Sequence, residues 1–81
     1  MSFPLFSRVA LTVDIPEHEL RTGDVATIVD QHSAGTRTGY SVEVFNATGD
    51  TIAVIVVDET QIEPLRNDEI FHVRMLHKAI A

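Results

Sequence analysis

The chain of 81 residues contains no cysteine and no tryptophan, and its single tyrosine is Tyr40. Without cysteine there is no disulfide framework, no thiolate zinc site and no cysteine nucleophile. With so few aromatic side chains, the sequence lacks both the clustered rings of a proline-peptide groove and the stacking platforms that single-stranded nucleic acids need. The fold must therefore be held together by non-covalent packing.

Basic residues are also scarce. Six lysines and arginines stand against twelve acidic residues, which gives a net charge of −6 with no long block of either sign. Nucleic-acid binding depends on basic side chains that neutralise phosphates, and anionic membranes attract basic segments, so both are disfavoured as partners. A basic protein partner is electrostatically permitted, although an acidic surface commonly serves only solubility.

Long hydrophobic runs are absent. The longest run, Ile52–Val57, has six residues, whereas a membrane-spanning helix needs about 20. Residues 1–8 have neither the basic start nor the unbroken apolar stretch of a signal peptide. We therefore expect a cytoplasmic protein with no membrane association.

The pattern that is present is the alternation of β-strands, rich in valine and isoleucine. Alternating apolar and polar side chains predict strands because successive residues of a strand point to opposite faces. The segment Val9–Ile15 alternates clearly until Pro16 ends it. The strands expected from this pattern are Val9–Ile15, Val25–Gln31, Tyr40–Phe45 and Thr51–Val57.

Glycine-containing turns separate these strands. Gly23-Asp24 opens the second strand, and Gly49 has the position of a left-handed residue that closes a hairpin turn. The segment Ser33–Gly39 predicts an exposed, mobile hairpin connection, since it contains two glycines and no large apolar residue. Thr51–Val57 is apolar on both faces, so we expect it to be the most enclosed strand.

The tail is ambiguous. Glu69–Leu76 is compatible with a strand that has Phe71, Val73 and Met75 on one face, and also with a short helix. Its β-forming residues favour the strand. We therefore expect an all-β fold, a small SH3-like, partly open barrel of five to six short strands with a C-terminal extra strand or short helix. Residues 1–81 form a single domain, with a lead over 1–7 and a tail over 66–81.

Several of these segments resemble an uncharacterised family of small bacterial SH3-like barrel proteins, catalogued as a domain of unknown function. The resemblance covers roughly residues 8 to 76, and its motifs are structural turns and strands. It implies the barrel fold and no established biochemistry. Family members encoded beside small toxin-like proteins suggest an antitoxin or immunity role. Where the family has Gly-Asp-Val-Gly, this chain has Ala26 in place of the second glycine. The segments that carry the resemblance are Val9–Leu11, Asp14–Glu17, Leu20, Gly23–Val25, Thr27–Val29, Tyr40–Phe45, Gly49 and Asp68–Arg74.

No motif for catalysis or metal binding stands out. The chain has four histidines, and only His72 and His77 are close in sequence; their spacing of five suits neither a strand face nor a helix face. No nucleophile elbow and no phosphate-binding glycine loop occurs. We expect no enzyme activity, no catalytic residue, no metal and no cofactor.

The remaining hypothesis is a non-catalytic protein-interaction module, of which an antitoxin or immunity protein is one version. Its partner is expected to be another protein, basic in charge, contacted through the acidic loop around Pro16–Thr22 or through an exposed strand edge. The alternatives are a nucleic-acid-binding barrel of the ribosome-associated type and a structural homo-oligomer such as a homodimer. The candidate binding residues are Asp14, Glu17, His18, Glu19 and Tyr40.

Overall fold

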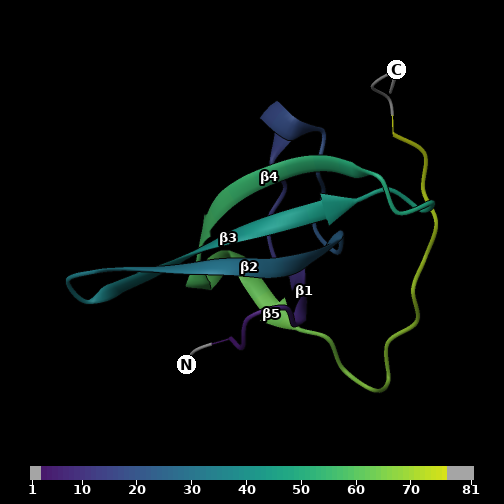
Figure 1. Ribbon diagram of the computed structural model, residues 1–81. Helices are drawn as coiled ribbons and strands as arrows, with labels where there is room; N and C mark the ends of the chain where they lie inside the picture. Colours follow the sequence, from purple (N-terminus) through teal and green to yellow (C-terminus); the bar gives the residue numbers. More distant parts are fainter. Residues whose placement is uncertain (1–2, 77–81) are drawn as a thin grey trace.

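The computed structural model describes residues 3–76 and confirms an all-β fold with almost no helix (Figure 1). One open antiparallel sheet has the strand order β4-β3-β2-β1-β5, which is consistent with a small, partly open barrel. Its strands are β1 (Arg8–Leu11), β2 (Val25–Ala34), β3 (Arg37–Phe45), β4 (Thr51–Asp58) and β5 (Ile62–Pro64). Two short 3₁₀ helices, η1 (Pro16–His18) and η2 (Glu59–Gln61), complete it.

The core lies on the inner face of this sheet and follows the alternation of the sequence. On β3, for example, Tyr40, Val42 and Val44 are buried, while Ser41 and Glu43 between them are only partly covered. Phe3 covers the core from the N-terminal lead, and its ring meets that of Tyr40 edge to face at 5.4 Å. The rest of the core consists of Val9, Leu11, Ile15, Leu20, Ala26, Ile28, Ile55, Val57 and Ile62.

The first strand is shorter than expected. β1 ends at Leu11 instead of continuing to Ile15, because the chain bends and Ile15 forms an isolated bridge with Leu20. This bridge closes the loop that contains η1 and buries Leu20, which is only 2% exposed. Proline at the start of η1 suits a position whose backbone N–H needs no helical partner.

The two strands β2 and β3 continue through the segment expected to be a mobile connection. They pair from Thr27–Glu43 out to Ala34–Arg37, so Ser33–Gly39 is mostly ladder and the turn is confined to two residues. Gly35 in this turn has a φ of 64°, which glycine adopts without strain. The expectation of a long connection was therefore wrong, because backbone pairing does not require apolar side chains.

The turn between β3 and β4 agrees with its prediction. Gly49 has a φ of 91°, and its N–H donates to the carbonyl of Asn46. The side-chain oxygen of Asn46 also accepts from the backbone N–H groups of Thr48 and Asp50, at 3.1 and 2.8 Å. These bonds fix the hairpin that places β4 beside β3.

Two expectations about the later part of the chain were wrong. β4 is not the most enclosed strand. It lies at one edge of the sheet, and its residues Val54 and Val56 are 60% and 69% exposed. Residues 65–76 contain no strand or helix, since no backbone hydrogen bond between described residues joins them to the sheet. This segment, the tail from here on, runs as an irregular chain outside the sheet (Figure 1).

Candidate functional site

A groove lies between η1 and the outer edge of β4. It has a volume of about 400 Å³ and is open to solvent. One side is formed by residues 14–18, which include two carboxylates, and the other by residues 54–56 of β4, with Gln61 completing the lining. The groove thus combines an apolar strand edge with an acidic rim, which suits a polypeptide better than a small, enclosed ligand.

The β4 edge of the groove is unprotected. β4 has a neighbouring strand on one side only, and no backbone hydrogen bond between described residues reaches 51–57 from outside its ladder with β3. The stretch Thr51–Val57 contains no charge and no proline. The opposite edge, β5, is only three residues long and ends at Pro64. Proteins usually blunt free edges as β5 does, whereas the described part of this chain does not blunt the edge of β4.

Three of the five predicted binding residues line this groove. Asp14, Glu17 and His18 lie along its η1 side. Glu19 follows directly, with an exposed side chain and a left-handed φ of 60°. Tyr40 was expected at the binding surface, but it is fully buried and its hydroxyl accepts a hydrogen bond from the N–H of Phe3 at 3.1 Å. Burying the ring gains apolar contacts while the hydroxyl keeps a partner, so Tyr40 is a core residue.

Asp14 is held in place by the loop opposite it. Its Oδ1 accepts from the backbone N–H of Thr22 at 2.8 Å and from the Thr22 hydroxyl at 3.0 Å. The backbone hydrogen bond, followed by that from the hydroxyl, holds the pKa of Asp14 below its ordinary value. The carboxylate is therefore a fixed negative charge at the groove, available to a cationic partner.

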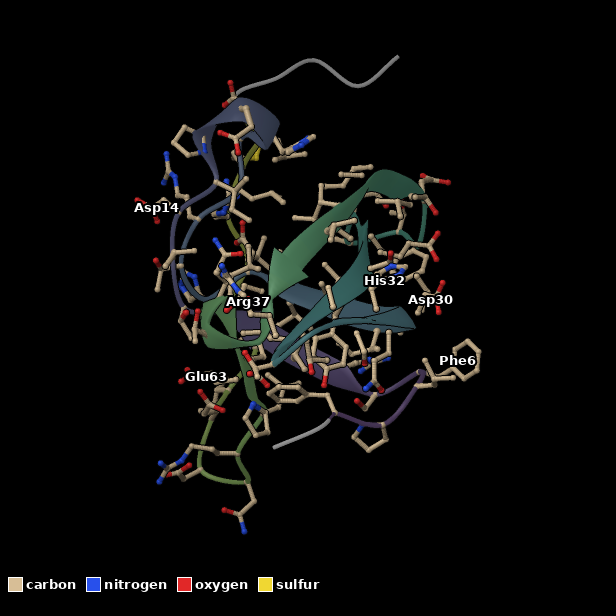
Figure 2. The ribbon with its side chains drawn as sticks, turned by 90° about the vertical axis from the view of Figure 1, so that its left-hand side faces the viewer. Phe6, Asp14, Asp30, His32, Arg37 and Glu63 are labelled. Atoms are coloured by element: carbon tan, nitrogen blue, oxygen red, sulfur yellow. The ribbon has the colours of Figure 1, made fainter. Side chains whose placement is uncertain are left out.

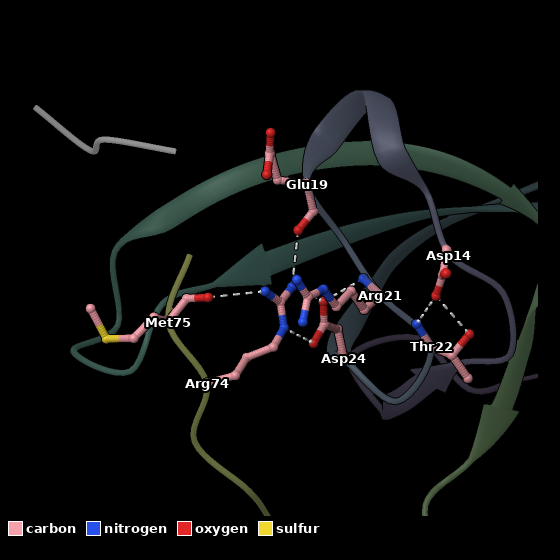
Figure 3. A network of polar contacts seen from close by, with 7 residues as sticks. All are labelled: Asp14, Glu19, Arg21, Thr22, Asp24, Arg74 and Met75. Carbon is pink, nitrogen blue, oxygen red and sulfur yellow. Dashed lines mark hydrogen bonds and ion pairs between the residues drawn. The ribbon is translucent and has the colours of Figure 1, made fainter. Parts of the chain in front are cut away.

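A second polar cluster ties the tail to the Gly-Asp turn (Figure 3). Arg74 donates from Nε to Oδ1 of Asp24 at 2.9 Å and from Nη2 to Oδ2, and Nη2 also donates to the carbonyl of Glu19 at 2.9 Å. Oδ2 of Asp24 in turn accepts from the backbone N–H of Arg21 at 2.7 Å. The hydrogen bonds that Arg74 donates to Asp24 raise the pKa of Arg74 further above its ordinary value. The side chains of Arg74 and Asp24 are 25% and 20% exposed. Their contact anchors the tail beside the loop that follows η1.

The two other described histidines, His32 and His72, lie on the surface. Among the described residues, no three His, Cys, Asp or Glu side chains come together to hold a metal, and within 3–76 no buried side-chain polar atom lacks a partner. His32 pairs with the Ser41 hydroxyl at 2.7 Å on the exposed surface. His72 is exposed, and His77, considered with it as a possible ligand, lies outside the described residues.

Two parts of the surface were missed by sequence reasoning. Val54 and Val56 belong to a stretch that is apolar on both faces, and this pattern predicted a strand buried on both sides. The same pattern also fits an edge strand with an exposed apolar outer face. Arg74 gave no local signal, since its partner Asp24 is 50 residues away. In both cases the missing information was which distant segments lie side by side.

One family model matches the chain, over residues 5–64, and is described as a domain of unknown function (DUF4926). No curated protein and no solved structure matches the chain. The matched residues include η1, all five strands and the groove, and they stop before the tail. Among the described residues no helix is long and apolar enough to cross a membrane.

Proposed function

We propose, from the premise that the chain belongs to the DUF4926 family, that it is a non-catalytic protein-interaction module which binds an extended polypeptide segment along β4. The single observation that carries the proposal is the free edge of β4, an eight-residue strand with exposed Val54 and Val56. Strand addition at such an edge obtains its affinity from main-chain hydrogen bonds and its specificity from side chains at alternate positions. The fold that presents the edge is the SH3-like barrel proposed from the strand pattern.

The groove also favours a particular partner chemistry. Val54 and Val56 project from the same face of β4, so they favour apolar side chains at alternate positions of the added strand. Asp14 and Glu17 on the opposite side of the groove favour lysine or arginine on the partner. A protein with a basic, β-forming segment fits both requirements. An antitoxin or immunity protein that covers a basic enzyme is one form that such a module takes.

The test is site-specific photo-crosslinking in the native lysate. A photoreactive amino acid replaces Val56, and a second version of the chain carries it in place of Phe6. Phe6 is the matched control because it is 73% exposed, close to the 69% of Val56, and projects on the side of the molecule away from Asp14 (Figure 2). We expect a discrete protein adduct from position 56 and none from position 6.

The identity of the crosslinked residues provides the second readout. Adducts from position 56 should map to an extended segment of the partner, and replacing Asp14 with Asn should reduce their yield as the acidic rim weakens. A lack of any adduct at position 56, or equal labelling from positions 56 and 6, contradicts the proposal.

A further inference from the structure

The tail has the chemical character of a strand but pairs with no strand among the described residues. Ile70, Phe71, Val73 and Met75 are 92%, 65%, 80% and 81% exposed, which is unusual for so many large apolar side chains close together. Arg74 and Leu76, by contrast, are partly buried. Side chains therefore alternate between the molecule and the solvent along residues 73–76, as in a strand. The tail presents an apolar face to the solvent.

The tail is also held in a defined position. Arg74 binds Asp24 and the carbonyl of Glu19, and the guanidinium of Arg8 lies over the ring of Phe71 at 5.9 Å from its centre. A segment fixed at two points loses less conformational entropy on binding than a free one. The exposed apolar face is thus presented in an already ordered segment.

The charge of the tail is compatible with that of the groove. All 12 acidic residues of the chain precede Ile70, so the described tail from Ile70 to Leu76 carries no acidic residue. The groove beside β4 has Asp14 and Glu17 on its rim. The exposed apolar face of the tail can therefore approach the acidic rim of the groove without repulsion between carboxylates.

We propose that the tail of one copy pairs with the β4 edge of a second copy, so that the chain forms a homodimer with two reciprocal contacts. The inference rests on the proposed function, because it names the occupant of the same edge. Arg74 keeps each tail on the loop after η1 of its own copy, and its outward side chains Phe71, Val73 and Met75 meet Val54 and Val56 of the other. Each copy gives a tail and receives one, as a two-fold symmetric dimer requires.

The test uses purified full-length chains and sedimentation equilibrium. The edge variant is Val56→Lys, since lysine is the residue that blocks strand edges. The tail variant is Val73→Ser combined with Met75→Ser. All three positions are largely exposed, so thermal melting should show the folds intact. We expect each variant to raise the dimer dissociation constant at least about tenfold, and the matched control Phe6→Ser to leave it unchanged.

Mixing the two variants gives the decisive result. The tail variant keeps an intact edge and the edge variant keeps an intact tail, so a mixed dimer regains one of the two contacts. The mixture should therefore associate more tightly than either variant alone. A monomeric wild-type chain at millimolar concentration, an unaffected edge variant, or a mixture no tighter than its components overturns the dimer. If crosslinks from position 56 then join only other proteins, the proposed function stands without this inference.

Discussion

The contact between Arg74 and Asp24 gives the most direct prediction, because it is the main bond between the tail and the barrel. Two opposite charges about 4 Å apart near a protein surface attract by about 4 kcal/mol. Desolvation of two side chains that are only 25% and 20% exposed, and the ordering of a long arginine, offset most of this attraction. We expect a net coupling of about 1 kcal/mol.

A double-mutant cycle isolates this coupling. Urea unfolding of the wild type, Arg74→Met, Asp24→Asn and the double variant gives four free energies of unfolding, and the cycle removes the separate effect of Asp24 on the N–H of Arg21. The exposed pair Arg37–Asp58, in which Arg37 is 78% exposed, is the control and should show a smaller coupling. A coupling for Arg74–Asp24 within about 0.3 kcal/mol of zero would refute the reasoning.

Three further outcomes follow from single positions. Gly49→Ala should lower stability by about 1 kcal/mol in thermal melts because of the φ of 91°, whereas Gly39→Ala, which has no positive φ and an ordinary contact at 3.4 Å, should not. Tyr40→Phe leaves the N–H of Phe3 without its buried partner and should cost about 1 to 3 kcal/mol in urea unfolding. Asp14 has a lowered pKa in the folded state, so its stabilising effect is present above the ordinary value of about 3.9 and is lost as the pH falls below it. The free energy of unfolding should therefore fall less steeply for Asp14→Asn than for the wild type as the pH is lowered through this range, which urea unfolding at a series of pH values measures.

Local pattern was enough to predict much of the barrel. Alternation identified the buried faces of the strands, and the glycine position predicted the left-handed turn at Gly49. The burial of Leu20 also follows from its being the single apolar residue of the otherwise polar segment Glu17–Thr22. Each of these features depends on residues close together in the sequence, where sterics and hydrogen bonding of the backbone decide the outcome.

The errors arose where distant segments meet. Whether Thr51–Val57 lies inside or at the edge depends on the order of the strands, and apolar composition alone does not distinguish the two. Tyr40 has an amphipathic side chain, and its burial depends on Phe3, 37 residues away. Asp14, Glu17 and His18, three of the residues predicted from the sequence, line one side of the groove, whereas its opposite wall on β4 was not anticipated.

The pairing of β1 with β5 has a consequence for how the chain folds. β2, β3 and β4 join through short turns, so their ladders form between neighbours in sequence and close quickly. β1 cannot gain its second partner until Ile62–Pro64 is available, since Ala10 pairs with Glu63 across nearly the whole matched family region. Closing so long a loop costs conformational entropy that only the finished core offsets. On the ribosome, the barrel therefore stays incomplete until its last strand emerges, and until then Val9 and Leu11 lack part of their cover.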